Sequence, residues 1–136
     1  LYVKCATHLE VAEAIKRMVV RGAPAIGVAA AMGLALVAYR GSNKSREELL
    51  RELDAAAQIL RSARPTGVNP FWAIKRVLDK ARSVDGGGGA IAEAIIEEVK
   101  AIAEEDVAAN RALGRFGAQL LDDGDVVLTQ CNQLHQ

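Results

Sequence analysis

Apolar residues recur along this chain with the period of an α-helix. Near the N-terminus, Val11, Ile15 and Val19 are spaced by four, which places them on one helical face. Thr7 and Glu10 precede them in the T-x-x-E pattern of a capping box, in which each side chain satisfies a free backbone N–H at the helix start. The pattern predicts a helix that begins just after Thr7.

The segment from Pro24 to Tyr39 carries no charge and is apolar on every side. A helix of that kind is typical of the centre of a bundle. Gly27 and Gly33 each cost about 1 kcal/mol in a helix interior relative to alanine, so their presence favours a close approach of neighbouring backbones. Gly41 is expected to end this helix.

Two more helices are marked by their first residues. Ser45 and Glu48 form a second capping box. The helix that they begin is expected to stop at Arg64, because the residue before a proline is disfavoured in the helical conformation. Asn69, followed by Pro70, then predicts an N-cap and the first turn of the next helix.

A long last helix is predicted from Ala90 to Leu121, after a glycine stretch, Gly86–Gly89, that is interpreted as a flexible surface linker. Asp106 and Asn110 fall on its apolar stripe and share one face. Because buried polar groups need partners, we expect a structural pair that bonds a neighbouring turn rather than a direct substrate contact. The apolar stripe comprises Ile91, Ile95, Val99, Ile102, Leu113, Phe116 and Leu120.

These elements predict a mainly α fold, an N-terminal helical bundle of about five helices, with a strand at Val126–Thr129. Composition agrees with a globular domain: 51% of the residues are hydrophobic, 25% are charged, and the formal net charge of zero gives no reason to expect nucleic acid. Cys5 and Cys131 form no metal-ligand spacing, and two thiols favour a reduced, cytoplasmic protein. The uncharged run Gly22–Tyr39 is short of the roughly 20 residues that span a membrane, so no membrane contact is expected.

One position carries candidate chemistry. Arg21 and Gly22 stand directly before the helix that Pro24 begins. The free N–H groups at a helix start and the helix dipole both favour an anion, and a glycine lets the backbone approach closely. The pattern predicts an anion-binding site, although it is also consistent with a plain turn beside a solvated arginine.

The run RGAPAIGVAAAMGLAL, from Arg21 to Leu36, resembles the signature of methylthioribose-1-phosphate isomerases, enzymes of methionine salvage that are related to the regulatory subunits of translation initiation factor 2B. Three further segments resemble the same family in the same order: ARPTGVNPFWAIKR at 63–76, EEDVAANRALGRFGAQLL at 104–121 and VVLTQCN at 126–132. Four ordered motifs are far more specific than any one of them.

The resemblance implies a protein longer than this chain. Members of the family carry a Rossmann-like α/β domain after the cysteine motif. Residues 1–124 are therefore predicted as the helical N-terminal domain and residues 125–136 as the start of a truncated C-terminal domain. Leu1 and Gln136 both look like cut ends, and Gln133–Gln136 departs from the family pattern and is not expected to be native sequence.

The resemblance also implies the reaction. As a full-length protein, the chain is expected to be an aldose–ketose isomerase that converts 5-methylthioribose 1-phosphate to 5-methylthioribulose 1-phosphate. Arg21, with Gly22 and Ala23, and also Arg64 are placed on the substrate phosphate, which arginine binds well. The expected partner is this small sugar phosphate, with no metal and no cofactor, and the family suggests a homodimer.

The same resemblance assigns Cys131 to the reacting carbons and its proton-transfer partner, an aspartate, to the missing domain. A cysteine at a strand end can instead be a small buried hydrophobe. Gln130 stands where the family usually has a histidine, and glutamine cannot titrate, so the thiol of Cys131 is expected to be less activated. We expect the chain on its own to be inactive.

Two alternatives stay open. A ribose-1,5-bisphosphate isomerase is a close relative that would hold a second phosphate where the methylthio group goes. A non-catalytic regulatory subunit of the initiation factor 2B type would act by binding alone. Phosphate-binding arginines together with a thiol argue against the second alternative, since a scaffold has no need of them.

Overall fold

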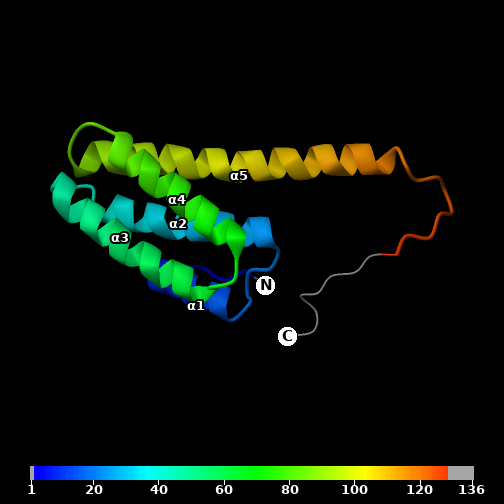
Figure 1. Ribbon diagram of the computed structural model, residues 1–136, viewed down its shortest axis with the longest axis horizontal. Helices are drawn as coiled ribbons and strands as arrows, with labels where there is room; N and C mark the ends of the chain where they lie inside the picture. Colours follow the sequence, from blue (N-terminus) through cyan, green and yellow to red (C-terminus); the bar gives the residue numbers. More distant parts are fainter. Residues whose placement is uncertain (1, 129–136) are drawn as a thin grey trace. The chain divides into compact units, whose positions relative to one another are not determined.

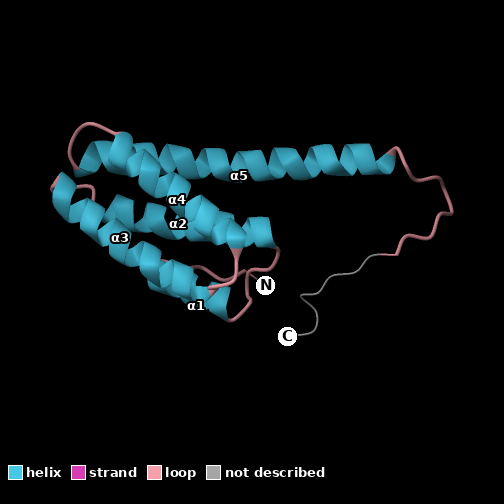
Figure 2. Ribbon diagram, viewed as in Figure 1, coloured by secondary structure: helices cyan, strands magenta, loops and turns pink. Residues whose placement is uncertain are grey.

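The structure is a computed structural model that describes residues 2–128, and every regular element in this range is a helix (Figure 1, Figure 2). The chain divides into two units, residues 1–106 and 107–136, and each is described by itself. The prediction of a mainly α fold is confirmed. The helices are α1 (His8–Lys16), α2 (Ala23–Arg40), α3 (Arg46–Ala63), α4 (Val68–Ser83) and α5 (Gly88–Ala118).

Helix α2 is the central helix of the first unit, as its uniformly apolar sequence predicts. It packs against α1, α3 and α4, and the side chains of Ala30 and Leu34 have no exposed surface. A Cβ atom on Gly27 would lie 3.1 Å from the backbone oxygen of Asn69, so this glycine lets α2 and α4 approach closely. Among the described residues, α2 is the one helix long and apolar enough to cross a membrane, and its packing on three neighbours accounts for that composition.

The two predicted capping boxes both mark helix starts. The hydroxyl oxygen of Thr7 accepts a hydrogen bond from the backbone N–H of Glu10 at 3.2 Å, directly before α1. Ser45 and Glu48 form a complete capping box at the start of α3, with each side chain bonded to the other residue's backbone N–H. Both predicted helix starts are therefore confirmed. A capping side chain marks a helix start because the first N–H groups of a helix have no acceptor within the helix.

The predicted start of α4 is wrong. The helix begins at Val68 with Gly67 as its N-cap, so Asn69 already lies inside the first turn. The N–H of Gly67 donates to the Arg64 carbonyl at 3.1 Å, and this turn brings the chain into the helix earlier than Asn69. Pro70 is tolerated there because first-turn N–H groups have no acceptor within the helix.

The first turn of α3 also fixes the connection between α4 and α5. The guanidinium of Arg46 donates to the Arg82 carbonyl at 2.8 Å, to the Val84 carbonyl, and to the Gly86 carbonyl at 3.5 Å. The last four carbonyl groups of a helix accept no hydrogen bond from an N–H group of the same helix. Arg46 therefore caps the end of α4 from a neighbouring helix.

The glycine stretch before α5 is not a flexible linker along its whole length. Gly88 and Gly89 belong to the first turn of α5, and Gly88 is buried. The N–H of Gly88 donates to the Lys44 carbonyl at 3.2 Å. A Cβ atom at Gly88 would lie 2.4 Å from that same oxygen, so glycine is required here by close packing.

Helix α1 ends in a left-handed turn. Met18 has a φ of 57°, and the N–H of Val19 donates to the Ala14 carbonyl at 2.9 Å. This is the hydrogen bond of a Schellman motif, which usually places glycine at the left-handed position. Methionine adopts that conformation at a cost of roughly 1 kcal/mol.

In the second unit, the apolar stripe of α5 was predicted to be buried, but it is exposed. Leu113 and Phe116 are 70% and 60% exposed, and none of the described residues beyond Ile102 is buried. A stripe is buried only against another apolar face, and residues 107–128 contain no second helix or sheet. Val126–Leu128 is irregular, so the predicted strand is not formed within the described residues, and Thr129 lies outside them.

Replacing Gly88 by alanine is expected to lower the free energy of unfolding by about 1–3 kcal/mol, because the new methyl group overlaps the Lys44 carbonyl. Gly89→Ala is the matched control, since its Cβ atom would meet the Ser42 carbonyl oxygen at an ordinary 3.6 Å. Urea denaturation of both variants measures the difference. A Gly88→Ala protein as stable as the Gly89→Ala protein would contradict this account of the packing.

Candidate functional site

The start of α2 is the first part of the candidate site. Gly22 is the N-cap, with a φ of 88°, and no side chain caps the helix. A positive φ of this kind is adopted easily only by glycine. Arg21, directly before it, is exposed, and Ala23 begins the first turn, whose N–H groups have no acceptor within the helix. The helix start is thus open to an anion from solvent.

Arg64 occupies the corner between α3 and α4. It is half-buried as the C-cap of α3, and its N–H donates to the Arg61 carbonyl at 3.3 Å. The α1–α2 and α3–α4 connections lie at the same end of the bundle (Figure 1), where Gly27 comes close to the backbone of Asn69. Arg21 and Arg64 therefore flank one end of the first unit, and their joint contact with a phosphate remains a prediction.

A pocket of about 470 Å³ opens at this end, between the first turns of α2 and α4 and the middle of α5. All of its walls belong to the first unit. Its lining contains two carboxylates and no lysine or arginine. The lining residues are Pro24, Gly27, Val28, Val68, Asn69, Trp72, Ile102, Glu105 and Asp106.

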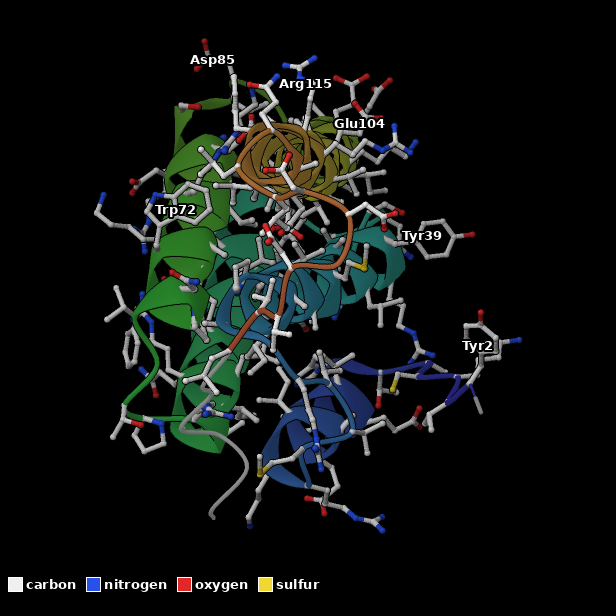
Figure 3. All side chains as sticks on the ribbon, turned by 90° about the vertical axis from the view of Figure 1, so that its right-hand side faces the viewer. Tyr2, Tyr39, Trp72, Asp85, Glu104 and Arg115 are labelled. Atoms are coloured by element: carbon white, nitrogen blue, oxygen red, sulfur yellow. The ribbon has the colours of Figure 1, made fainter. Side chains whose placement is uncertain are left out.

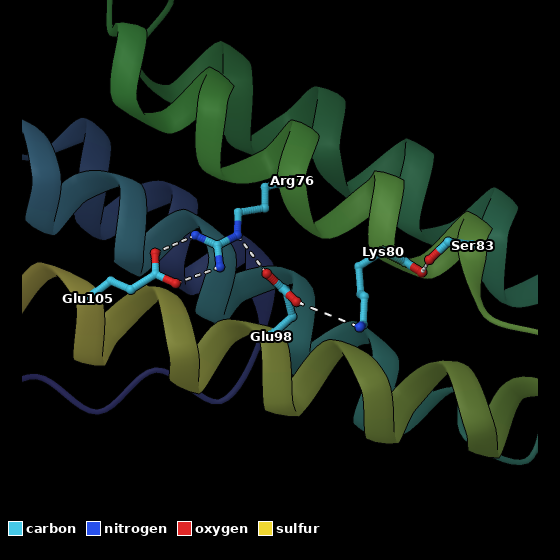
Figure 4. Close-up of polar contacts among 5 residues, drawn as sticks. All are labelled: Arg76, Lys80, Ser83, Glu98 and Glu105. Atoms are coloured by element: carbon cyan, nitrogen blue, oxygen red, sulfur yellow. Dashed lines mark hydrogen bonds and ion pairs between the residues drawn. The ribbon is translucent and has the colours of Figure 1, made fainter.

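An ion-pair network holds one wall of this pocket (Figure 4). The guanidinium of Arg76 donates to both carboxylate oxygens of Glu105, at 2.5 and 2.8 Å, and its Nε donates to Glu98 at 2.6 Å. The same guanidinium lies over the Trp72 ring, 5.4 Å from the ring centroid. Figure 3 shows Trp72 on the outer side of α4, and its side chain is 53% exposed. The network thus fixes two lining residues, one aromatic and one acidic.

The same contacts change the pKa values of their partners. The hydrogen bonds from Arg76 lower the pKa of Glu105 below its ordinary value, and hydrogen bonds to Glu105 and Glu98 raise the pKa of Arg76. The backbone and hydroxyl of Ser45 lower the pKa of Glu48 in the capping box. All three groups are consequently held in their charged forms near neutral pH.

The structure distributes the sequence-predicted polar residues unevenly. Asp106 is half-buried and lines the pocket, whereas Asn110 is exposed and belongs to the second unit. Their expected role as a bonded structural pair stays a prediction.

Sequence reasoning missed Trp72 as a pocket residue, because an aromatic side chain on a helix looks like ordinary apolar content. Cys131 and Gln130 lie outside the described residues.

Among residues 2–128, no group of three or more histidine, cysteine, aspartate or glutamate side chains could hold a metal ion.

A sequence profile of the Initiation factor 2 subunit family matches residues 19–134. The chain belongs to this family.

Family relatives include methylthioribose-1-phosphate isomerases from Pelotomaculum thermopropionicum, 46% identical over 132 residues, and from Geobacter metallireducens, 47% identical over 136 residues. The matches cover 96% and 97% of this chain but only 36% and 38% of the relatives. The chain thus spans little more than a third of their length.

Two solved structures share the fold of this chain. The 5-methylthioribose 1-phosphate isomerase from Pyrococcus horikoshii has a TM-score of 0.81 and 45% identity, over 87% of this chain and 33% of that chain. The protein described as translation initiation factor eIF-2B, subunit delta, from A. fulgidus has a TM-score of 0.84 and 45% identity, over 96% and 38% of the two chains. The helical arrangement of this chain therefore recurs in both of these proteins.

Acid is expected to weaken the pairing of Glu105 with Arg76. Because the folded-state pKa of Glu105 lies below its ordinary 4.5, this stabilisation is fully present above that value and is lost as the pH falls through the folded-state pKa. Melting temperatures from about pH 6 to about pH 3 should fall more for the natural chain than for Glu105→Gln. Glu104→Gln, which changes the exposed neighbour on α5, is the matched control and should follow the natural chain. Identical profiles for all three proteins would contradict the assignment.

Proposed function

We propose that this segment is the N-terminal part of an isomerase that interconverts 5-methylthioribose 1-phosphate and 5-methylthioribulose 1-phosphate in methionine salvage. The observation that carries the proposal is the 46% identity to methylthioribose-1-phosphate isomerases over 96% of the chain. Because the chain spans only part of the length of those enzymes, we assign the activity to a full-length protein. By full-length protein we mean this segment followed by the rest of the sequence that those enzymes have.

The substrate phosphate is proposed to bind at the start of α2. Arg21 supplies the guanidinium fork, and the N–H groups of Gly22 and Ala23 supply donors on a helix dipole that favours anions. Arg64 adds a second cation from the α3–α4 connection at the same end of the bundle. The open, uncapped helix start and the positive φ of Gly22 support this role. Two arginines match the roughly two negative charges of a phosphate ester.

The reaction explains why the phosphate needs such an anchor. An ester on the anomeric oxygen blocks simple opening of the sugar ring to a free aldehyde, so the site must hold the phosphate and assist ring opening. Isomerisation then moves a proton between neighbouring carbons, a step that a positioned group accelerates by about 10²–10⁴-fold. Cys131 is proposed to act at these carbons, with an aspartate of the remaining isomerase length as its partner. The reaction is redox-neutral overall, and no cofactor is proposed.

A second candidate function is that of a non-catalytic regulatory subunit, and the similarity to the A. fulgidus protein described as eIF-2B, subunit delta, favours it. Ribose-1,5-bisphosphate isomerisation is a third. Incubating the full-length protein with methylthioribose 1-phosphate and with ribose 1,5-bisphosphate separates them. Turnover of the first compound supports the proposal, turnover of the second alone reassigns the substrate, and turnover of neither supports a binding function.

The same proposal extends to the setting of the protein. Residues 125–136 are proposed to begin a C-terminal α/β domain that follows the helical residues 1–124. The family match over residues 19–134 reaches into both segments. We place the protein in the cytoplasm as a homodimer, with a sugar phosphate as its ligand and with neither nucleic acid nor membrane as a partner. Light scattering of the full-length protein measures the subunit number.

In the full-length protein, Arg21→Ala is expected to cost about 2–5 kcal/mol of transition-state binding, because the phosphate loses a paired cation. Steady-state kinetics measure this loss as a fall in kcat/KM. Arg40→Ala is the matched control, since Arg40 is exposed at the opposite end of the same helix. A fall of less than about threefold for Arg21→Ala would refute the phosphate assignment.

The 136-residue chain by itself is expected to show no isomerase activity. It supplies proposed phosphate ligands and one thiol but no matched proton-transfer group, and it lacks the second wall that would exclude water from the substrate. A sensitive assay for the ketose product, with the full-length protein as the positive control, checks this. Activity in the short chain would place the proton-transfer group among residues 1–136, with Asp106 as the first residue to replace.

A further inference from the structure

We propose that the groove between α3 and α4 is a second anion site, which binds a phosphate ion or a phosphate monoester on the guanidinium of Arg61. Lys75, from α4, supplies the second positive charge. Among the described residues, those that line this groove include neither Arg21 nor Arg64, and none of them lines the pocket at the start of α2. The site therefore does not depend on the proposed isomerase function.

The groove has room for such a ligand. Helices α3 and α4 pack against each other, and the groove between them has a volume of about 450 Å³, within the usual range for small-molecule sites. Two of its eight lining residues, Ala57 and Leu78, are apolar and buried, and the other six are polar or charged. A lining of this kind favours a charged ligand over an apolar one.

Arg61 is the residue on which the site depends. Its side chain is half-buried, and its Nε atom is buried without a hydrogen-bond partner among the residues that the structure describes. Native proteins rarely leave a buried donor in that state, so the position suits a ligand oxygen. The guanidinium also lies over the Phe71 ring, 5.8 Å from its centroid. A guanidinium restrained in this way loses little freedom when its planar fork binds a phosphate.

The two carboxylates of the groove are already bonded to other cations. Asp54 accepts a hydrogen bond from Arg82 at 2.7 Å, and Asp79 accepts one from Lys75 at 2.5 Å. The lining thus contains three cations and two carboxylates. One positive charge, that of Arg61, is not balanced within the groove, and an anion would balance it.

Lys75 can contribute the second charge. The side chains of Lys75 and Asp79 are 72% and 52% exposed, and ion pairs as exposed as this one are weak. A ligand can therefore compete for the ammonium group. A phosphate monoester carries roughly two negative charges at neutral pH, which match Arg61 and Lys75 together, whereas a single carboxylate carries one. This match favours phosphate as the ligand.

The side chain of Arg61 reports binding directly, because each arginine Nε–H group gives its own signal in nitrogen–proton NMR spectra. The 136-residue chain is titrated with inorganic phosphate, and separately with succinate, at an ionic strength held constant with sodium chloride. Arg61→Lys identifies the signal by removing it. We expect phosphate to shift this signal in a saturable way, with a dissociation constant on the order of 1 mM, and succinate to bind at least about threefold more weakly.

Three variants locate the effect. Asp79→Asn removes the carboxylate that competes for Lys75 and should tighten phosphate binding by about threefold or more. Arg51→Gln is the matched control, since Arg51 is exposed on α3 outside the groove lining, and it should leave the titration unchanged. Arg21→Ala removes the proposed substrate anchor and should also leave the shift of the Arg61 signal intact.

Each contrary outcome has one meaning. An Arg61 signal that phosphate moves no further than chloride does overturns the site. Succinate binding more tightly than phosphate overturns phosphate as the ligand class, and an unchanged dissociation constant in Asp79→Asn overturns the role of Lys75. A shift that disappears in Arg21→Ala overturns the groove as a separate site, while it supports the phosphate anchor at the start of α2.

Discussion

Burial of the small-residue helix α2 is the constraint on which the rest of the molecule depends. Ala30, Ala31 and Ala38 have no exposed surface, so three neighbouring helices can pack against a narrow rod. The approach of Gly27 to the backbone of Asn69 sets the start of α2 beside the start of α4. Any larger residue at Gly27 would push these starts apart. The packing of the core therefore sets the geometry of the candidate site. A helix start that is supported by a packed core can hold a ligand rigidly.

The network around Arg76 contributes orientation more than stability. Its partners are partly exposed, with the Glu105 side chain 57% accessible, and ion pairs of this kind add little to the free energy of unfolding. Their value lies in geometry. The planar guanidinium makes a paired contact with one carboxylate and lies over an aromatic ring, so one side chain orders two others across α4 and α5.

Local signals in the sequence predicted the fold well where the deciding interaction was itself local. The capping boxes at Thr7 and Ser45 are short-range contacts, and both mark real helix starts. The glycine stretch that contains Gly88 was predicted to be a flexible linker, and this was wrong for Gly88. Glycine is required there because of the Lys44 carbonyl, 44 positions earlier in the chain, and a run of glycines gives no sign of such a distant contact.

The candidate site divides in the same manner. The anion-binding pattern at Arg21 and Gly22 is readable from adjacent residues, and the structure shows an uncapped helix start there. The pocket is not readable, because Val28, Trp72 and Asp106 come from three helices and meet only through packing. Asp106 gave a partial signal, a charge on an apolar stripe, while the stripe beyond Ile102 predicted burial that the described residues do not show.

The left-handed turn at Met18 has a consequence for how the chain can be cut. A protease needs a locally opened backbone, and a residue held in a strained conformation lowers the cost of that opening. Lys16, Arg17 and Arg21 place three trypsin-sensitive bonds around this turn. Limited digestion should therefore begin in the α1–α2 connection, detach α1 from the bundle, and slow down when an anion occupies the start of α2.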